Sequence, residues 1–209
     1  MTFKFGNFYF KNNDLYPVDK LIEKVLYDPK NGYYSKKFPF GSNGDFITAP
    51  TISNLFSEII AIWVVSAWEK LGKPKVFNFV ELGPGDGSLA KVLLETFMKF
   101  PEFNRSKKFY LYEKSNKLKN FQKNKLKNFD IEWIKNFNNI NNGPVIFFGN
   151  EFFDALPIKQ FLVKDGEILE KFFSVDKRHG LKEFYKKTNS RDIKKIRSFN
   201  SLKNRDFIE

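Results

Sequence analysis

The stretch that decides the fold is Val76-Phe77-Asn78-Phe79-Val80-Glu81-Leu82, followed directly by Gly83-Pro84-Gly85-Asp86-Gly87. Its first part is a nearly continuous apolar run, as in the buried strands of parallel sheets. The three glycines stand at alternate positions, so the backbone can turn tightly and approach a ligand that a Cβ atom would repel. Ser88 can then cap a helix over Leu89–Phe100. A strand, a glycine turn and a helix in this order are typical of nucleotide-binding folds.

Strands and helices continue to alternate after this turn. We expect a strand at Lys108–Tyr112, a helix at Asn116–Leu126, a weak strand at Asp130–Ile134 and a stronger strand at Pro144–Phe148. This alternation predicts an α/β fold built on a parallel, doubly wound, Rossmann-like sheet. The sheet is expected to be incomplete, because sheets of this kind normally continue past a fourth strand.

Two helices and a loop are expected before the sheet. The spacing of apolar residues predicts a short helix at Asp19–Tyr27 and a long helix at Ser53–Leu71. Residues 31–46 lie between them and are rich in glycine and aromatic residues, a composition that suits an ordered loop. We therefore expect a helical N-terminal cap that carries a lid loop.

The pattern changes after Pro157. Lys159–Lys164 and Glu167–Val175 alternate like the two arms of a hairpin around Asp165-Gly166, a strong turn signal. The tail from Lys186 is charged and shows no strand able to complete a sheet, so we interpret the chain as incomplete. The predicted domains are residues 1–72 (cap and lid loop), 73–158 (Rossmann-like core) and 159–209 (hairpin insertion and basic tail).

Composition excludes several classes of protein. The chain has no cysteine, which excludes disulfides, Cys-ligated zinc and a Cys nucleophile. Its single histidine, His179, leaves no cluster for a metal site or a Ser-His-Asp triad. The formal net charge is +12, but the lysines are scattered, so no nucleic-acid partner is expected. No signal peptide or membrane-crossing apolar run is found, which favours the cytoplasm.

Two acidic residues decide which nucleotide the glycine turn suits. Glu81 lies at the end of the first sheet strand and Glu113 at the end of the next. Glu113 can accept hydrogen bonds from both ribose hydroxyls, and Glu81 can approach the cationic amino-acid moiety of S-adenosylmethionine. That cofactor has no pyrophosphate, so Asp86 at the helix N-terminus is acceptable here, whereas it would repel the anion of NAD. S-adenosylmethionine is favoured, and a nucleotide-dependent oxidoreductase stays as the alternative.

A second acidic segment, Asn150-Glu151-Phe152-Phe153-Asp154-Ala155-Leu156-Pro157, follows the strand at Val145–Phe148. Ligands in open α/β sheets bind at the carboxyl ends of the strands, so this segment is expected to face the cofactor crevice. Glu151 and Asp154 could hold a guanidinium, whose fixed donors suit paired carboxylates. In the alternative reading Asp154 caps a helix and the two phenylalanines belong to the core.

Several uncommon short motifs follow one another along residues 15 to 163. They are Leu26-Tyr27-Asp28-Pro29 with Gly32-Tyr33-Tyr34, Pro39-Phe40-Gly41, Gly44-Asp45-Phe46-Ile47-Thr48-Ala49-Pro50, Ile52-Ser53, Trp63, Trp68, Val80-Glu81-Leu82-Gly83-Pro84-Gly85, and the segment at residues 150–157 with Gln160-Phe161. This order resembles the MidA family of class I methyltransferases, which includes the mitochondrial complex I assembly arginine methyltransferase.

The resemblance implies a Rossmann-like methyltransferase with a helical N-terminal cap and an S-adenosylmethionine cofactor. It also implies methylation of a protein arginine on a respiratory NADH dehydrogenase subunit, in the cytoplasm of a bacterium or in the mitochondrial matrix of a eukaryote. The predicted catalytic residues are Glu151 and Asp154. The predicted cofactor-binding residues are Glu81, Gly83, Gly85, Gly87, Glu113 and Asn150. The predicted substrate and lid residues are Gly44, Asp45, Phe46, Thr48, Pro50 and Phe153.

The chain departs from the family pattern at a few positions. Asp86 replaces the usual arginine after the second glycine, Thr51 replaces the acid after Thr-Ala-Pro, and Ser115-Asn116 replaces the Ser-Pro after the ribose acid. A non-catalytic complex I assembly factor that retains the fold is therefore the other alternative.

Overall fold

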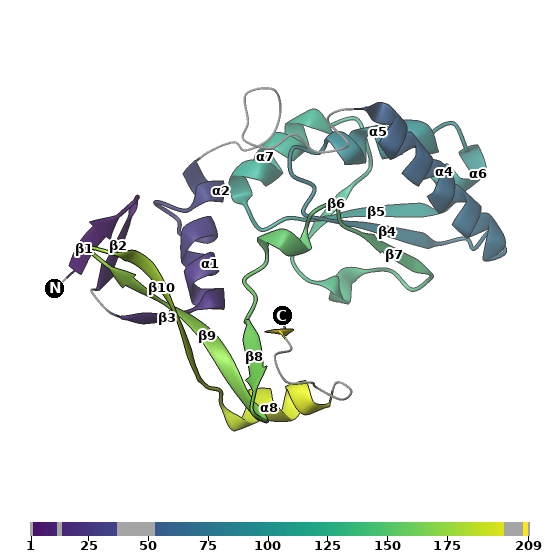
Figure 1. Cartoon of the computed structure of the whole chain (residues 1–209). Helices are drawn as coiled ribbons and strands as arrows, with labels where there is room; N and C mark the ends of the chain where they lie inside the picture. The colour runs from purple at the N-terminus through teal and green to yellow at the C-terminus, as the bar shows by residue number, and fades with distance from the viewer. Residues whose placement is uncertain (1, 12–13, 37–52, 199–206, 209) are drawn as a thin grey trace. The chain divides into compact units, whose positions relative to one another are not determined.

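The computed structural model describes residues 2–11, 14–36, 53–198 and 207–208 (Figure 1). It separates into two compact units, one formed by residues 1–36 with 155–209 and the other by residues 37–154. This division differs from the predicted one. The long helix after residue 53, predicted as part of the cap, belongs to the unit that holds the parallel sheet, and residues 14–36 pack with the C-terminal hairpin instead.

The larger unit is built on a four-stranded parallel sheet, which confirms the predicted fold class. Its strands are β4 (Phe77–Leu82), β5 (Lys107–Tyr112), β6 (Glu132–Ile134) and β7 (Val145–Phe148). Their order is β6-β5-β4-β7, so the chain moves outward from β4 to one edge and then returns to its other side. That reversal next to β4 is the switch point at which doubly wound sheets bind ligands.

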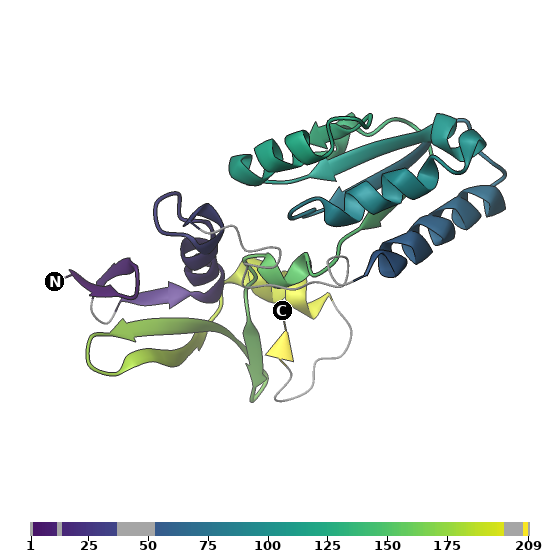
Figure 2. The ribbon, with the colours of Figure 1, turned by 90° about the horizontal axis from the view of Figure 1, so that it is seen from above.

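One face of this sheet is covered by helices α4, α5 and α7, as Figures 1 and 2 show. The helices of the unit are α4 (Asn54–Lys70), α5 (Ser88–Phe97), α6 (Pro101–Ser106) and α7 (Asn116–Lys125). The Ser53 hydroxyl caps α4 by accepting from the Leu55 N–H. Ala61, Val64 and Trp68 of α4 are buried against α5, because an apolar stripe at helical spacing must cover another element. This packing explains why α4 belongs to the sheet unit.

The helix after the glycine turn differs in detail from the prediction. Its N-cap is Gly87 rather than Ser88, and it ends at Phe97 rather than Phe100. The Asp86 carboxylate already accepts from the Ser88 N–H, so a Ser88 cap is not needed. Pro101 then starts α6, and the residue before a proline is driven out of the helical region.

The other face of the sheet carries Val80, Leu82, Tyr110 and Ile134, packed under the segment that holds η1 (Phe137–Asn139). This cover is thin. Val145 and Phe147 of β7 keep 40% and 46% of their surface exposed. Within the described residues, no α-helix of this unit lies on that face (Figure 2).

The smaller unit contains the predicted hairpin. The hairpin strands are β8 (Phe161–Lys164) and β9 (Glu167–Asp176). Asp165 and Gly166 between them both have positive φ, as a tight two-residue hairpin turn requires. β9 also pairs with β10 (Gly180–Lys187) and with β3 (Leu15–Pro17), which leads into α1 (Val18–Tyr27) and α2 (Tyr33–Lys36).

The tail is more ordered than predicted. Within the described residues it adds no strand to the parallel sheet, but it does hold strands, because β10 extends to Lys187 and β11 (Phe207–Ile208) pairs with β8. Between them, α8 (Ser190–Arg197) buries Ile196 against the hairpin. The apolar residues of this helix are too few to indicate a helix within such a charged sequence. The first two strands, β1 (Thr2–Phe5) and β2 (Phe8–Lys11), form a separate hairpin.

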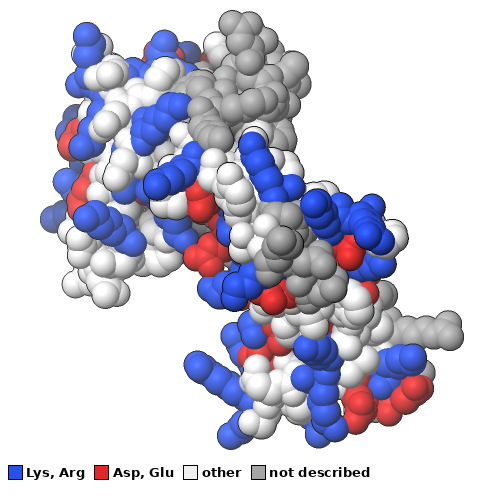
Figure 3. All heavy atoms as spheres, turned by 90° about the vertical axis from the view of Figure 1, so that its left-hand side faces the viewer, with Lys and Arg blue, Asp and Glu red and all other residues white. Residues whose placement is uncertain are grey.

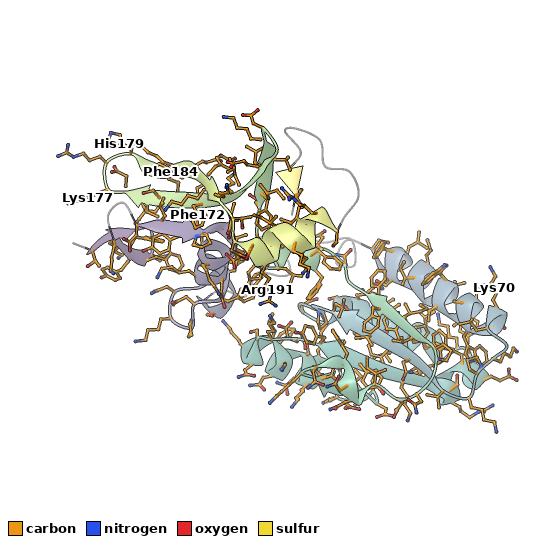
Figure 4. All side chains as sticks on the ribbon, turned by 90° about the horizontal axis from the view of Figure 1, so that it is seen from below. Lys70, Phe172, Lys177, His179, Phe184 and Arg191 are labelled. Carbon is orange, nitrogen blue, oxygen red and sulfur yellow. The ribbon has the colours of Figure 1, made fainter. Side chains whose placement is uncertain are left out.

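Charged side chains are spread over the described surface. On the face drawn in Figure 3, Lys and Arg occur with Asp and Glu among them. Lys177 and His179 lie at the turn between β9 and β10 (Figure 4), where the His179 ring is 2.9 Å from the Asp176 carboxylate. No helix in the described part of the chain is both long and apolar enough to span a membrane.

Candidate functional site

The glycine turn adopts a backbone that other residues rarely reach. Gly83, Gly85 and Gly87 all have positive φ, at 63°, 56° and 74°. The Gly83 N–H donates to the Tyr112 carbonyl of the neighbouring strand, which fixes the start of the turn. A Cβ atom on Gly83 would lie 2.7 Å from Cδ2 of Phe152, so glycine is required there by space as well as by conformation.

Glu81 lies just before this turn and is only 3% exposed. Its Oε2 atom has no hydrogen-bond partner among the described residues. Burial, with a smaller contribution from the charge of Asp86, raises the pKa of Glu81 to about 8. A buried carboxyl group without a partner is a costly arrangement that a cationic ligand would relieve.

Glu113 follows the end of β5, beside the glycine turn. Register pairs Leu82 with Tyr112, so the residues after these two strands lie at the same edge of the sheet. The Ser115 N–H donates to Glu113 Oε1 at 2.8 Å, and the Gln122 side chain lies 3.4 Å from Oε2. Burial raises the pKa of Glu113, and these hydrogen bonds offset the effect only in part. The two predicted acids are thus held at the ends of two adjacent strands.

Asp86 is neutralised within the turn. Its carboxylate accepts from the backbone N–H and the hydroxyl of Ser88, and Lys125 of α7 donates to it at 2.9 Å. Burial opposes ionisation of Asp86, but the bonds to Ser88 and Lys125 outweigh it and hold the pKa of that carboxyl below its usual range. Lys125 could not be singled out from the sequence, because it is one of many lysines on a polar helix.

Gln122 of α7 is a further residue that sequence reasoning missed. Its side chain is fully buried and donates to the Gly85 carbonyl at 2.8 Å. It accepts from the Trp133 indole N–H at 3.0 Å. Gln122 also packs near Gly87, whose absent Cβ would face Gln122 and Leu126. The glycine at position 87 is therefore explained by its φ and by α7, while its role in cofactor binding stays a prediction.

The second acidic segment returns to the glycine turn, as its position after β7 predicts. Phe152 packs over Gly83 and Gly149 and contacts the Tyr112 ring. Glu151 has a positive φ of 56° and an exposed side chain. Asp154 and Phe153 are also exposed, and Phe153 lies in the short helix η2 (Phe153–Ala155). Among the described residues, the carboxylates of Glu151 and Asp154 have no hydrogen-bond partner, so no helix cap by Asp154 is seen there.

Of the other predicted site residues, Asn150 lies at the end of β7, half-buried, next to Gly149. The predicted lid residues Gly44, Asp45, Phe46, Thr48 and Pro50 lie outside the described residues. Glu81, the glycine turn and Glu113 are thus brought together at one edge of the sheet, and Phe152 links them to the segment at residues 150–154.

Comparison with known proteins gives a consistent result. The family described as "Putative S-adenosyl-L-methionine-dependent methyltransferase" matches residues 59–207. A fruit-fly (Drosophila melanogaster) protein named "Protein arginine methyltransferase NDUFAF7 homolog, mitochondrial" is 33% identical over 80% of this chain and 43% of its own length. The human "Protein arginine methyltransferase NDUFAF7, mitochondrial" is 30% identical over 76% of this chain and 42% of its own length.

The fold also has a solved counterpart. A likely methyltransferase from Burkholderia thailandensis, solved with S-adenosylhomocysteine bound, superposes with a TM-score of 0.69 at 24% identity, over 89% of this chain and 49% of that one. The chain thus spans less than half the length of these relatives. Because the family match covers most of the chain, this protein belongs to the family of S-adenosyl-L-methionine-dependent methyltransferases.

Proposed function

We propose that this chain carries the cofactor-binding part of an S-adenosylmethionine-dependent protein arginine methyltransferase. The observation that supports this most is the pair Glu81 and Glu113, at the ends of two adjacent strands beside a turn of three positive-φ glycines. Family membership supports the same cofactor.

Two parts of the cofactor, its amino-acid moiety and its ribose, each have a group suited to them. Glu81 offers a buried oxygen without a partner to the ammonium of the amino-acid moiety, and Glu113 offers carboxylate oxygens to the ribose hydroxyls. Phe152 fixes the loop that faces them. A pyrophosphate would instead meet Asp86, which is held ionised by Ser88 and Lys125. This contrast favours S-adenosylmethionine over NAD.

The bound cofactor would supply a sulfonium methyl group for direct in-line displacement by a substrate nitrogen. The sulfur would keep the electron pair of the broken carbon–sulfur bond, so that S-adenosylhomocysteine leaves, and the methylated nitrogen would release one proton to solvent. The contribution of the chain is alignment of the reacting groups, which needs no covalent intermediate on the protein. Glu151 and Asp154 are proposed to orient a guanidinium and to localise its charge, so that one nitrogen becomes more nucleophilic. Their exposed carboxylates, unpaired among the described residues, are available for this role.

The substrate is proposed to be an arginine on a subunit of a respiratory NADH dehydrogenase. This rests on the arginine methyltransferase named in the relatives and on the family resemblance. The names of these relatives place them in mitochondria. The proposed location of this chain is the mitochondrial matrix if its source is a eukaryote and the cytoplasm if it is a bacterium.

A methyl-transfer assay tests the activity. Candidate subunits are incubated with the chain and isotope-labelled S-adenosylmethionine, and methylarginine is identified by mass spectrometry. We expect labelled arginine with the wild-type chain and its loss with Glu113→Ala, while Asp130→Ala, an exposed acid in the same unit, leaves the label unchanged. Full labelling with Glu113→Ala would contradict the assigned cofactor site.

The substrate-side acids make a separate prediction. Glu151→Ala or Asp154→Ala should slow methyl transfer about tenfold or more, the effect of losing one charge-assisted hydrogen bond, and leave the affinity for S-adenosylhomocysteine nearly unchanged. Single-turnover rates and calorimetric titrations measure the two quantities. Equal losses of rate and cofactor affinity would remove the proposed role.

Two alternatives have distinct outcomes. A non-catalytic assembly factor is favoured by the departure at Asp86, and it would bind the respiratory subunit without transferring a methyl group. A nucleotide-dependent oxidoreductase would bind NAD in preference to S-adenosylhomocysteine. Parallel titrations with the two ligands separate it from the methyltransferase.

A further inference from the structure

The amide of Gln122 is held in one orientation by three partners. Its Nε2 donates to the Gly85 carbonyl at 2.8 Å and lies 3.4 Å from Glu113 Oε2, while its Oε1 accepts from the Trp133 indole at 3.0 Å. An indole N–H can only donate, and a carbonyl or a carboxylate can only accept. If the amide were flipped, its oxygen would face two acceptors and its NH₂ group would face the indole donor. The three hydrogen bonds therefore allow a single orientation of the Gln122 amide.

These partners belong to different parts of the site. Gly85 lies in the turn after β4, and Glu113 lies after β5. Trp133 belongs to β6 and packs against the core of the unit. Gln122 is thus a fully buried residue whose side chain connects the segments after β4 and β5 with the neighbouring strand β6. Leaving the buried amide of Gln122 unpaired would cost more than the net value of one of these bonds.

The helix that carries Gln122 is fastened to the glycine turn at two more points. Lys125 donates to the Asp86 carboxylate and to the Ser88 hydroxyl. Leu126, just after α7, fills the space beside Gly87, where an added Cβ would lie 3.3 Å from its Cδ1. Movement of α7 would therefore move the turn as well.

We propose that Gln122 is a positioning residue that fixes the glycine turn and the Glu113 carboxylate relative to each other before the cofactor binds. This inference rests on the proposed function, since it assumes that the glycine turn lies against S-adenosylmethionine and that Glu113 binds its ribose. Gln122 acts through these groups. Preorganisation of this kind raises affinity because the ligand does not have to order the site.

A double-mutant cycle with S-adenosylhomocysteine as the probe tests the coupling. Gln122→Met keeps the size of the side chain and removes its amide, and it should weaken binding roughly tenfold. In the Glu113→Gln background the same change should weaken binding roughly threefold or less, because the group that Gln122 orients has lost its charge. Asn124→Met, an amide replaced on the exposed side of α7, should leave affinity unchanged.

Trp133→Phe provides a second variant that keeps the ring in the core and removes only the donor to Gln122. It should weaken binding roughly threefold, while Trp63→Phe, an exposed tryptophan on α4, should have no effect. The indole N–H resonance of Trp133 should also shift when S-adenosylhomocysteine is added to the wild-type chain, and this response should vanish in Gln122→Met. A merely structural role predicts no such signal.

The outcomes separate the two claims. If the wild-type chain does not bind S-adenosylhomocysteine, the proposed function fails and this inference fails with it. If the wild-type chain binds but Gln122→Met weakens binding equally in both backgrounds, the inference alone is overturned. Unchanged affinity in Trp133→Phe overturns it as well, even where Gln122→Met does not fold.

Discussion

Glu81 is a buried carboxyl group for which the described residues provide no hydrogen-bond partner at Oε2. Its pKa of about 8 leaves it protonated at neutral pH in the free protein. A cationic ammonium beside it would favour the ionised form, so ligand binding should release a proton. At the scale of a single residue, the site is therefore incomplete until a cation enters it.

Proton release gives the first prediction. Below pH 8, affinity for S-adenosylhomocysteine should rise with pH, by up to about tenfold per unit, because the bound state needs Glu81 ionised. Calorimetry in two buffers with different ionisation enthalpies measures the protons released. The Glu81→Gln variant should bind weakly and release fewer protons; release that is unchanged in this variant would contradict the assignment.

The same group makes the stability of the free protein depend on pH. The pKa of Glu81 in the folded protein lies above its ordinary value of 4.5. Its contribution to the free energy of unfolding is therefore fully present below pH 4.5 and is lost as the pH rises towards about 8. Relative to Glu81→Gln, the free energy of unfolding of the wild-type chain should fall by up to about 1.4 kcal/mol per pH unit in this window. Urea unfolding across the window checks this, and parallel curves for the two proteins would refute it.

Gly83 and Gly72 give a matched pair of substitutions. Both have positive φ, at 63° and 82°, but only Gly83 has a neighbour where a Cβ would lie. Alanine at either position should cost about 1–2 kcal/mol of stability from backbone strain. Only Gly83→Ala should also displace Phe152 and lower cofactor affinity, by more than about tenfold. Equal affinities in the two variants would show that the space over Gly83 does not matter for binding.

At the scale of elements, α5 and α7 meet at the ion pair between Asp86 and Lys125. The side chains keep 15% and 25% of their surface exposed, so the pair is partly shielded from solvent. The carboxylate also satisfies the first N–H of α5 in place of a capping side chain. The departure from the family at Asp86 is thus accommodated by a residue on the neighbouring helix.

Lys125→Met should lower the free energy of unfolding by about 1 kcal/mol at neutral pH, because it leaves Asp86 charged and poorly paired. Adding Asp86→Asn should restore part of that loss, since removing both charges costs less than removing one. Lys127→Met, an exposed lysine just after α7, serves as the control. Denaturant unfolding measures all of them. A double variant less stable than Lys125→Met alone would contradict this account of the pair.

Local sequence was sufficient for some elements and not for others. The apolar run of β4 and the Asp165-Gly166 turn predicted their structures because periodicity and turn chemistry are local. Gln122 and Lys125 could not be predicted, since α7 is a polar sequence whose buried face depends on its contact with the glycine turn. The division into units also depends on contacts between residues far apart in the sequence. β3 and α1 pack against β9, which lies about 150 residues later in the chain, and local patterns do not reveal such a contact.

At the scale of the whole molecule, the proposed site residues of the described chain lie in the unit formed by residues 37–154. The other unit has its own core, in which Phe161, Ile168 and Ile196 are buried. A ligand held by Glu81, the glycine turn and Glu113 should therefore stabilise the backbone of one unit locally, because binding shifts opening equilibria only where it makes contact.

Hydrogen–deuterium exchange with and without S-adenosylhomocysteine tests this most directly. We predict slower exchange in peptides covering residues 83–88 and 113–122, and unchanged exchange in β9 and β10. The Glu113→Ala variant should show little protection at the same ligand concentration. Protection absent from the glycine turn, or found in the hairpin instead, would contradict the placement of the cofactor.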